Sequence, residues 1–254
     1  MAEFIKIEND GQVEKIILVK PKYNILDIPM MNELNAELEK IAADENLKCV
    51  VLTGEGRSFC AGVDIEDHKP EKVDEMAAAF NRIFVLINMI DIPVIAAVNG
   101  ACLGGGMEVA IACDMVIASE KAIFGQPEVK LGFFPPYGAI RLPELVGPAK
   151  TIEILTTGQN YSAQASKDFG FVSQVASADS FEEAVQKQVK QITMSSPLII
   201  RLNKRAVKRH MGTSFAQSID LVSDYFLNTL MKTEDTLEGI ASFEEKRRAV
   251  WKNR

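Results

Sequence analysis

Apolar and polar residues alternate along the chain in a pattern that predicts short strands interleaved with helices. Two alternating runs flank Asn9-Asp10-Gly11, a turn sequence that predicts a β-hairpin over residues 4–18. Short apolar runs rich in β-branched residues predict further buried strands at 49–53, 93–98 and 115–118.

Apolar residues at helical spacing predict the helices that lie between these strands. The first begins near Pro29, with Asp27 as its N-cap, and the second spans 71–89. A later helix is expected over 148–157, and the pattern is helical from residue 180 onward. Strands and helices in this order indicate an α/β chain.

Residues 93–132 hold the group of side chains around which the chain is organised. Gly104, Gly105 and Gly106 precede a short apolar helix that carries Glu108, and Glu128 follows in a glycine-proline loop. The start of a helix presents unpaired N–H groups, and glycines let a substrate approach them. Two carboxylates beside such an anion hole suit acid/base chemistry on a carbonyl substrate. The plainer alternatives are a tight strand-to-helix turn and solvated glutamates.

The segment GGGMEVAIACDMVIASEKAIFGQPEVKLG resembles the core signature of the enoyl-CoA hydratase/isomerase (crotonase) family. That signature starts a helix with Gly-Gly-Gly-x-Glu and places a second Glu in a Gly-x-Pro-Glu loop. Glu108 and Glu128 match both positions and stand twenty residues apart, as in the family. The resemblance implies the crotonase fold, a spiral of repeated ββα units with a C-terminal helical region. It also implies a catalytic role for both carboxylates.

A second stretch, Phe59-Cys60-Ala61-Gly62-Val63-Asp64-Ile65, resembles the first oxyanion loop of the family. The resemblance implies that the backbone N–H groups of Val63 and Gly105 bind the thioester oxygen of an acyl-CoA. It places further substrate or CoA contacts at Cys60, Ala61, Asp64, Ile65, Gly104 and Pro127. Because Cys60 has no neighbouring His or Lys to lower its thiol pKa, we expect a structural role for it.

Two other regions bear on how the substrate is bound. In the family, a loop at the position of Lys22 and Asn24 touches CoA. Lys22 either contacts a phosphate of CoA or is an ordinary exposed lysine of the loop, and the sequence leaves both alternatives open. After Glu128 the chain departs from the glycine-rich run of ordinary short-chain hydratases and carries Phe133, Phe134, two prolines and Tyr137. We expect these rings to form a stiff wall of the acyl pocket, with filling of the core as the alternative.

The segment from residue 63 to 84 looks most like the dienoyl-CoA hydratases of anaerobic aromatic degradation. The expected reaction is therefore hydration of a conjugated thioester such as cyclohexa-1,5-diene-1-carbonyl-CoA. Hydration of straight-chain substrates and double-bond isomerisation are the alternatives within the family. Isomerases commonly need only one carboxylate, so the pair favours a hydratase. No metal or redox cofactor is expected, because coenzyme A is part of the substrate.

The composition narrows the class of protein further. The chain has 254 residues, 47% of them hydrophobic, and a net charge of −7 that argues against a nucleic-acid partner. The same acidic balance and the intact motifs argue against a non-catalytic, RNA- or protein-binding relative. Four cysteines without C-x-x-C spacing indicate reduced thiols in a cytoplasmic protein. With only His68 and His210 available, a histidine-based metal site is not expected.

The sequence also supports expectations about the whole molecule. The start of the chain does not resemble a signal peptide, and no apolar run approaches the length of about 18 residues that a membrane span needs. The family resemblance implies a core spiral domain over 1–195 and a C-terminal helical region over 196–254. In relatives that region joins subunits, so we expect a trimer or a dimer of trimers.

Overall fold

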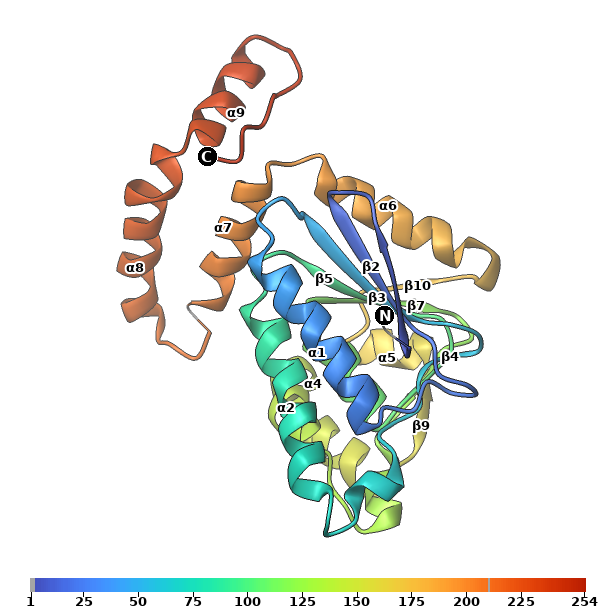
Figure 1. The fold of residues 1–254 in the computed structure, drawn as a ribbon. Coiled ribbons are helices and arrows are strands. Elements are labelled where there is room, and N and C mark those ends of the chain that lie inside the picture. Colours follow the sequence, from blue (N-terminus) through green and yellow to red (C-terminus); the bar gives the residue numbers. More distant parts are fainter. Residues whose placement is uncertain (1–2, 210) are drawn as a thin grey trace.

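The larger of two β-sheets forms the centre of the molecule (Figure 1). The computed structural model describes residues 3–209 and 211–254, so His210 lies outside the described residues. The larger sheet has the strand order β1 (Ile5–Asn9), β2 (Val13–Leu18), β3 (Cys49–Gly54), β5 (Val94–Val98), β7 (Met115–Ser119) and β10 (Gln174–Ala176). β1 and β2 form the predicted antiparallel hairpin, and the remaining neighbours pair in parallel.

A smaller sheet lies beside the larger one and was not predicted from the sequence pattern. Its strands, in order, are β4 (Ser58–Cys60), β6 (Ala101–Leu103), β8 (Ile123–Gly125) and β9 (Asn160–Ser162). β4, β6 and β8 each follow the preceding strand of the larger sheet after a short turn, and a helix follows each pair. This repetition of ββα units is the spiral that the family resemblance implies. Strands of three residues are too short to show a periodicity of their own.

The helices occupy the predicted segments, with one difference in extent. Their bounds are α1 (Ile28–Ala43), α2 (Val73–Met89), α3 (Gly105–Ala112), α4 (Pro136–Thr157), α5 (Ala163–Phe169), α6 (Phe181–Thr193), α7 (Pro197–Lys208), α8 (Phe215–Asn228) and α9 (Glu234–Glu244), with 3₁₀ turns η1 (Ile65–His68), η2 (Pro127–Leu131), η3 (Ala178–Ser180) and η4 (Leu230–Lys232). The predicted cap Asp27 accepts a hydrogen bond from the Met30 N–H at 3.1 Å. α4 consists of two helical segments that meet at the non-helical Gly147 (φ 77°): the second is the helix expected over 148–157, and the first, which begins at Pro136, was not predicted.

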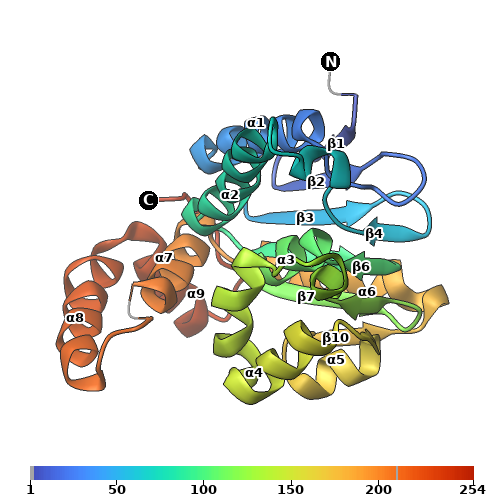
Figure 2. The same ribbon diagram turned by 90° about the horizontal axis from the view of Figure 1, so that it is seen from below.

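The helices cover the larger sheet on both faces. The main hydrophobic core lies where α1, α2 and α3 pack against one face, and a smaller cluster lies under α6 on the other (Figure 1). α3 is fully buried and lies between α2 and α4 (Figure 2). Cys49, Cys60, Cys102 and Cys113 are all free and buried, which confirms the prediction of core thiols.

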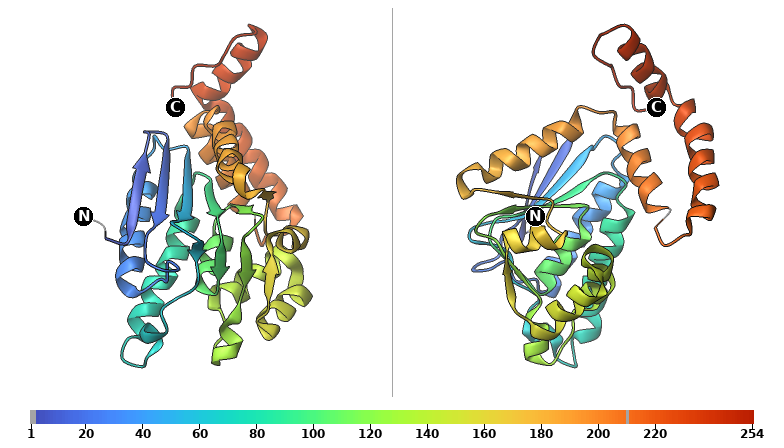
Figure 3. Two further views of the ribbon diagram at one scale, coloured as in Figure 1. Left: turned by 90° about the vertical axis from the view of Figure 1, so that its right-hand side faces the viewer. Right: turned by 180° about the vertical axis from the view of Figure 1, so that it is seen from behind.

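The last two helices extend away from the two sheets (Figure 3). α7 is attached to the core by ion pairs, Lys204 with Asp114 and Arg205 with Asp91. α8 and α9 carry exposed apolar side chains, namely Ile219, Leu221, Phe226, Leu227, Leu237, Ile240 and Phe243. Within the part of the chain that the structure describes, no helix has the length and apolar character of a membrane span.

Candidate active site

Three consecutive glycines allow two other segments of the chain to approach the start of α3. Gly104 is the N-cap and has a φ of 53°, in the left-handed region that favours glycine. A Cβ atom on Gly104 would lie 2.7 Å from a carboxylate oxygen of Glu128, and one on Gly105 would lie 2.6 Å from the Val63 side chain. Larger residues would therefore push the Val63 loop and Glu128 away from the helix start.

The loop that carries Val63 is fixed by the chain in front of α1. The Leu26 N–H donates to the Gly62 carbonyl at 2.9 Å, and the Asp64 N–H donates to the Leu26 carbonyl at 2.8 Å. In this parallel bridge the intervening N–H of Val63 points away from Leu26. Gly105 is the first residue of α3, so its N–H has no partner within the helix. The structure thus brings both predicted oxyanion donors to the start of α3.

Glu108 is a buried carboxyl group one turn into α3. Its side chain is only 2% exposed, and its Oε1 accepts a hydrogen bond from the Gly138 N–H at 2.8 Å. Burial raises the pKa of Glu108 to about 7, and the charge of Glu128 acts in the same direction. The N–H groups of Gly138 and Tyr137 oppose this rise because they stabilise the carboxylate.

Glu128 lies in the first turn of η2, with its carboxyl group directed at Gly104. Burial raises the pKa of Glu128 to about 7 as well. The fully buried Gln126 lies beside it; with its amide nitrogen facing Glu128, Gln126 donates to both carboxylate oxygens at 3.1 Å. Gln126 was not predicted as a site residue, although it stands two positions before Glu128 in the sequence Gly-Gln-Pro-Glu.

Glu108 and Glu128 together form a coupled pair of carboxyl groups. Both have a pKa of about 7, and the charge of Glu128 raises the pKa of Glu108. Near neutral pH each of the two carboxyl groups is therefore partly protonated, so each can act as an acid or as a base. Beside two N–H donors, this arrangement suits a reaction in which a carbonyl oxygen gains charge while a proton is moved.

Comparisons with known proteins agree with this geometry. A sequence profile described as enoyl-CoA hydratase/isomerase matches residues 8–254. The short-chain-enoyl-CoA hydratase of Clostridium acetobutylicum is 34% identical over 255 residues, which cover 98% of this chain and 97% of the relative. The carnitinyl-CoA dehydratase of Proteus mirabilis is 34% identical over 263 residues, which cover all of both chains. The chain belongs to the enoyl-CoA hydratase/isomerase family.

Solved structures show the same fold. The crystal structure of enoyl-CoA hydratase from Bacillus anthracis matches with a TM-score of 0.91 and 32% identity, covering 99% of this chain and 100% of that one. The predicted crotonase fold is therefore confirmed.

The aromatic residues after Glu128 occupy three different environments in this crotonase fold. Tyr137 is half-buried and stacks on Phe84 of α2, with ring centroids 4.0 Å apart and planes 8° apart. Phe133 packs against His68 of η1, with centroids 5.0 Å apart. Phe134 is 70% exposed. The expected continuous wall of rings is thus not seen, and only Tyr137 packs against the core.

Phe80 and Phe84 of α2 lie near the site, although neither was named among the predicted site residues. Phe80 meets Phe84 edge-on, with centroids 4.7 Å apart, and its ring would lie 3.0 Å from a Cβ on Gly105. The sequence signal was present, because both rings belong to the apolar stripe of this helix. The spacing of apolar residues along a helix does not predict which core residue each ring contacts.

The remaining predicted contact residues lie around the first oxyanion loop. Ala61 donates its N–H to the Tyr23 carbonyl at 3.0 Å, so the loop with exposed Lys22 lies beside it. Asp64 caps η1 by accepting from the Glu66 N–H at 2.9 Å. Pro127 is partly exposed, Ile65 is 59% exposed and Cys60 is fully buried. Burial raises the pKa of the Cys60 thiol to about 12, as expected for a structural cysteine.

Asn24 has a structural role that the resemblance did not indicate. Its side chain is 2% exposed, and its amide nitrogen donates to the carbonyl groups of Glu55, Ser58 and Phe59. Its Oδ1 accepts the Lys20 N–H at 2.9 Å. These bonds hold the Lys22 loop against β4. They occupy the amide, so this geometry does not favour the predicted contact between Asn24 and CoA.

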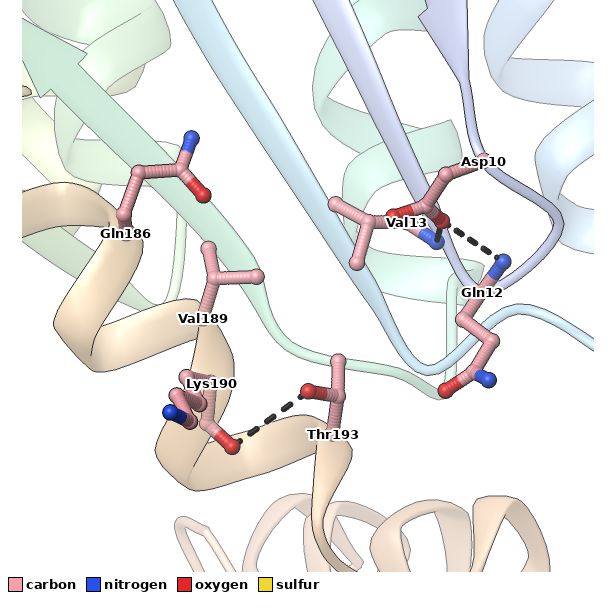
Figure 4. Close-up of a pocket in the computed structure, with 7 residues that line it drawn as sticks. All are labelled: Asp10, Gln12, Val13, Gln186, Val189, Lys190 and Thr193. Atoms are coloured by element: carbon pink, nitrogen blue, oxygen red, sulfur yellow. Dashed lines mark hydrogen bonds between the residues drawn. The ribbon is translucent and has the colours of Figure 1, made fainter.

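A separate cavity of about 260 Å³ lies between the β1–β2 turn and α6 (Figure 4). It is lined by Asp10, Gln12, Val13, Gln186, Val189, Lys190 and Thr193. Asp10 uses its carboxylate to accept the N–H groups of Gln12 and Val13 within the turn. None of the predicted site residues lines this cavity, and we assign it no part in the site. Among the described residues, no group of three His, Cys, Asp or Glu side chains is placed to hold a metal ion.

Proposed function

We propose that the protein is an enoyl-CoA hydratase that adds water to the conjugated double bond of an acyl-CoA thioester. The observation that carries this proposal is the coupled pair Glu108 and Glu128, both with a pKa of about 7, beside the start of α3. Two carboxyl groups that are each partly protonated near neutral pH can deprotonate water and protonate carbon in one reaction.

The proposed reaction begins with the thioester oxygen accepting hydrogen bonds from the N–H groups of Val63 and Gly105. One carboxylate takes a proton from water while the oxygen of that water bonds to the β-carbon. The double-bond electrons move toward the thioester oxygen, and the other carboxyl group delivers a proton to the α-carbon. Each N–H donor stabilises the transition state by about 3 kcal/mol. The addition of water causes no net oxidation or reduction of the substrate. We therefore propose that the reaction needs no cofactor beyond the CoA of the substrate.

The names of the relatives support this class of reaction. The Clostridium acetobutylicum relative is a short-chain-enoyl-CoA hydratase, and the Proteus mirabilis relative is a carnitinyl-CoA dehydratase. Both names describe water addition to, or removal from, an acyl-CoA. We infer the same chemistry here.

For the acyl group we propose cyclohexa-1,5-diene-1-carbonyl-CoA, and with it a role in aromatic degradation. The support is the stack of Tyr137 on Phe84, which places two flat rings next to Gly138, the residue that bonds Glu108. A stiff flat surface suits a planar acyl group that has no torsions to order. A straight-chain substrate is equally consistent with the relatives, so the two are compared directly in the test.

We also propose an assembly and a location. The core spiral domain, residues 1–195, would associate through the helical region 196–254 into a cytoplasmic trimer or a dimer of trimers. The exposed apolar side chains of α8 and α9 support this assembly. The free, buried cysteines suit a reducing compartment.

The test is the loss of conjugated-thioester absorbance when the purified protein is mixed with crotonyl-CoA or cyclohexadienoyl-CoA. We expect hydration of both, with a kcat/KM about 10-fold to 200-fold higher for the cyclic diene, the range that one or two apolar contacts produce. Equal or faster turnover of crotonyl-CoA overturns the cyclic substrate. Absence of hydration with every enoyl-CoA tested overturns the hydratase assignment.

A further inference from the structure

The amino end of α4 supplies hydrogen bonds to Glu108. α4 begins with Pro136, and its N-cap residue Pro135 makes no side-chain capping bond. The N–H groups of Tyr137 and Gly138 in the first turn have no partners within the helix. Gly138 uses its N–H to donate to Glu108 Oε1 at 2.8 Å. Glu108 therefore caps a helix through Gly138, a residue 30 positions later in the chain.

The ring of Tyr137 attaches this helix end to α2. It stacks on Phe84 with a centroid distance of 4.0 Å and nearly parallel planes, 8° apart. Phe84 in turn meets Phe80, whose ring lies against Gly105 at the start of α3. A column of three rings thus connects the helix end that bonds Glu108 with the helix start that carries Glu108.

We propose that Tyr137 is a positioning residue that acts through its stack on Phe84, holding the α4 amino end so that the Gly138 N–H stays bonded to Glu108. The residue does not need its hydroxyl group for this role, because the stack uses the ring. Loss of the stack lets the helix start move, which weakens a hydrogen bond to the charged form of Glu108. The pKa of Glu108 then rises further.

The other groups that face Glu108 do not supply this control. Glu128 raises the pKa of Glu108 and belongs to a different segment, η2. On α4, Arg141 donates to the Ile111 carbonyl of α3, at the other end of that helix. The strands that pack against α3 bring the thiols of Cys60 and Cys102, whose pKa values burial raises far above neutral pH. Neither thiol changes charge in the range where Glu108 titrates.

The test compares Tyr137→Ala with Tyr137→Phe, and uses Phe84→Leu as a second variant that removes the stack from the α2 side. The titration of Glu108 is followed by ¹³C NMR of glutamate-labelled protein, with the signal assigned by its absence in Glu108→Gln. We expect Tyr137→Ala and Phe84→Leu to titrate about one pH unit higher, the scale of one lost bond to a charged group. Tyr137→Phe is expected to titrate like the wild type.

The kinetic readout rests on the proposed hydratase activity. In Tyr137→Ala and Phe84→Leu, the pH profile of kcat is expected to move in the alkaline direction, with KM changing less than kcat. A folded Tyr137→Ala or Phe84→Leu protein whose Glu108 titrates as in the wild type overturns the proposal, even if its activity falls. If the wild type hydrates no enoyl-CoA, the proposed function fails, while the NMR titration still decides the role of Tyr137.

Discussion

Glu108 and Glu128 are held in positions where the fold withholds water from their carboxyl groups. Burial raises the pKa of each to about 7, so each is easily protonated near neutral pH. The Gly138 N–H bonds Glu108 and limits the rise of its pKa without removing it, and Gln126 lies beside Glu128. An acid and a base poised near the working pH are what water addition to a conjugated thioester requires.

The first prediction at this scale concerns turnover. Glu108→Gln and Glu128→Gln are each expected to lower kcat by about 100-fold or more, because a Gln side chain cannot exchange the proton. Binding of the CoA ester is expected to remain largely unchanged. Glu183→Gln, an exposed position on α6, is the matched control. Near-full activity of either active-site variant would show that the paired mechanism is wrong.

The second prediction concerns stability against pH. The folded-state pKa of Glu108 is about 7, above its ordinary value of 4.5, so ionising this group costs stability as the pH rises through this range. Glu108→Gln keeps an oxygen for the Gly138 N–H and is expected to unfold at a higher temperature than the wild type at pH 8. The gain is at most about 3 kcal/mol and falls close to zero near pH 4, below the ordinary pKa of the group. Thermal unfolding at both pH values checks this, and a variant less stable at pH 8 would contradict it.

At the residue scale, the sequence located the carboxyl groups and the glycines but not their supporting contacts. Spacing along one helix and one loop is a local property, so the positions of Glu108 and Glu128 were predictable. The bond from the Gly138 N–H to Glu108 and the stack of Tyr137 on Phe84 join segments distant in the chain, and no local pattern encodes them. For Asn24, the resemblance suggested a contact with CoA. In the structure this side chain is buried and its amide donates to the Ser58 carbonyl.

At the scale of elements, the 3₁₀ turn η1 holds the first oxyanion loop in place. Asp67 is 4% exposed and accepts the Ile28 N–H at 2.9 Å, which ties η1 to the start of α1. Lys72 donates to the same carboxylate at 3.0 Å. Burial alone would raise the pKa of Asp67, but these two donors outweigh it, and the pKa lies below its usual value. Asp67 thus fixes the segment that begins at Val63.

We predict that Asp67→Ala lowers both stability and turnover. The Ile28 N–H would lose its partner in a buried position, at a cost of about 1–3 kcal/mol, and the Val63 N–H would be less well placed. Lys72→Gln is the matched control, because this lysine side chain is half exposed and solvent screens its ion pair, so a smaller loss of stability is expected. Urea unfolding and kcat measure the two effects. Wild-type stability in Asp67→Ala would remove Asp67 from this role.

The strands and helices differed in how well their sequences predicted them. The hairpin, the β-branched strands of the larger sheet and the helix capped by Asp27 have patterns several residues long, and the structure confirms them. The three-residue strands of the smaller sheet have no such pattern and depend on pairing with one another. The early start of α4 was missed because two prolines suggested a stiff loop, although Pro136 takes the first helical position.

At the scale of the whole molecule, the C-terminal helices leave apolar surface without a partner in the single chain. Phe226 is 48% exposed and Leu227 is 59% exposed on α8, and Leu237 and Phe243 are exposed on α9. These helices extend away from the sheets (Figure 3). Exposed apolar groups gathered on one projecting segment are typical of a surface that another chain covers.

The last prediction is that α8 joins copies of this chain. Burying one large apolar side chain contributes about 1.5–3 kcal/mol, so several such groups on one helix can hold subunits together. Phe226→Glu combined with Leu227→Glu would place two charges in that interface and is expected to give monomers, because an unpaired charge is costly to bury. Asp224→Asn, an exposed polar change on the same helix, is the control and is expected to keep the wild-type mass. Sedimentation velocity measures the mass of each protein. A monomeric wild type, or a double variant with the wild-type mass, would show that α8 does not join the subunits.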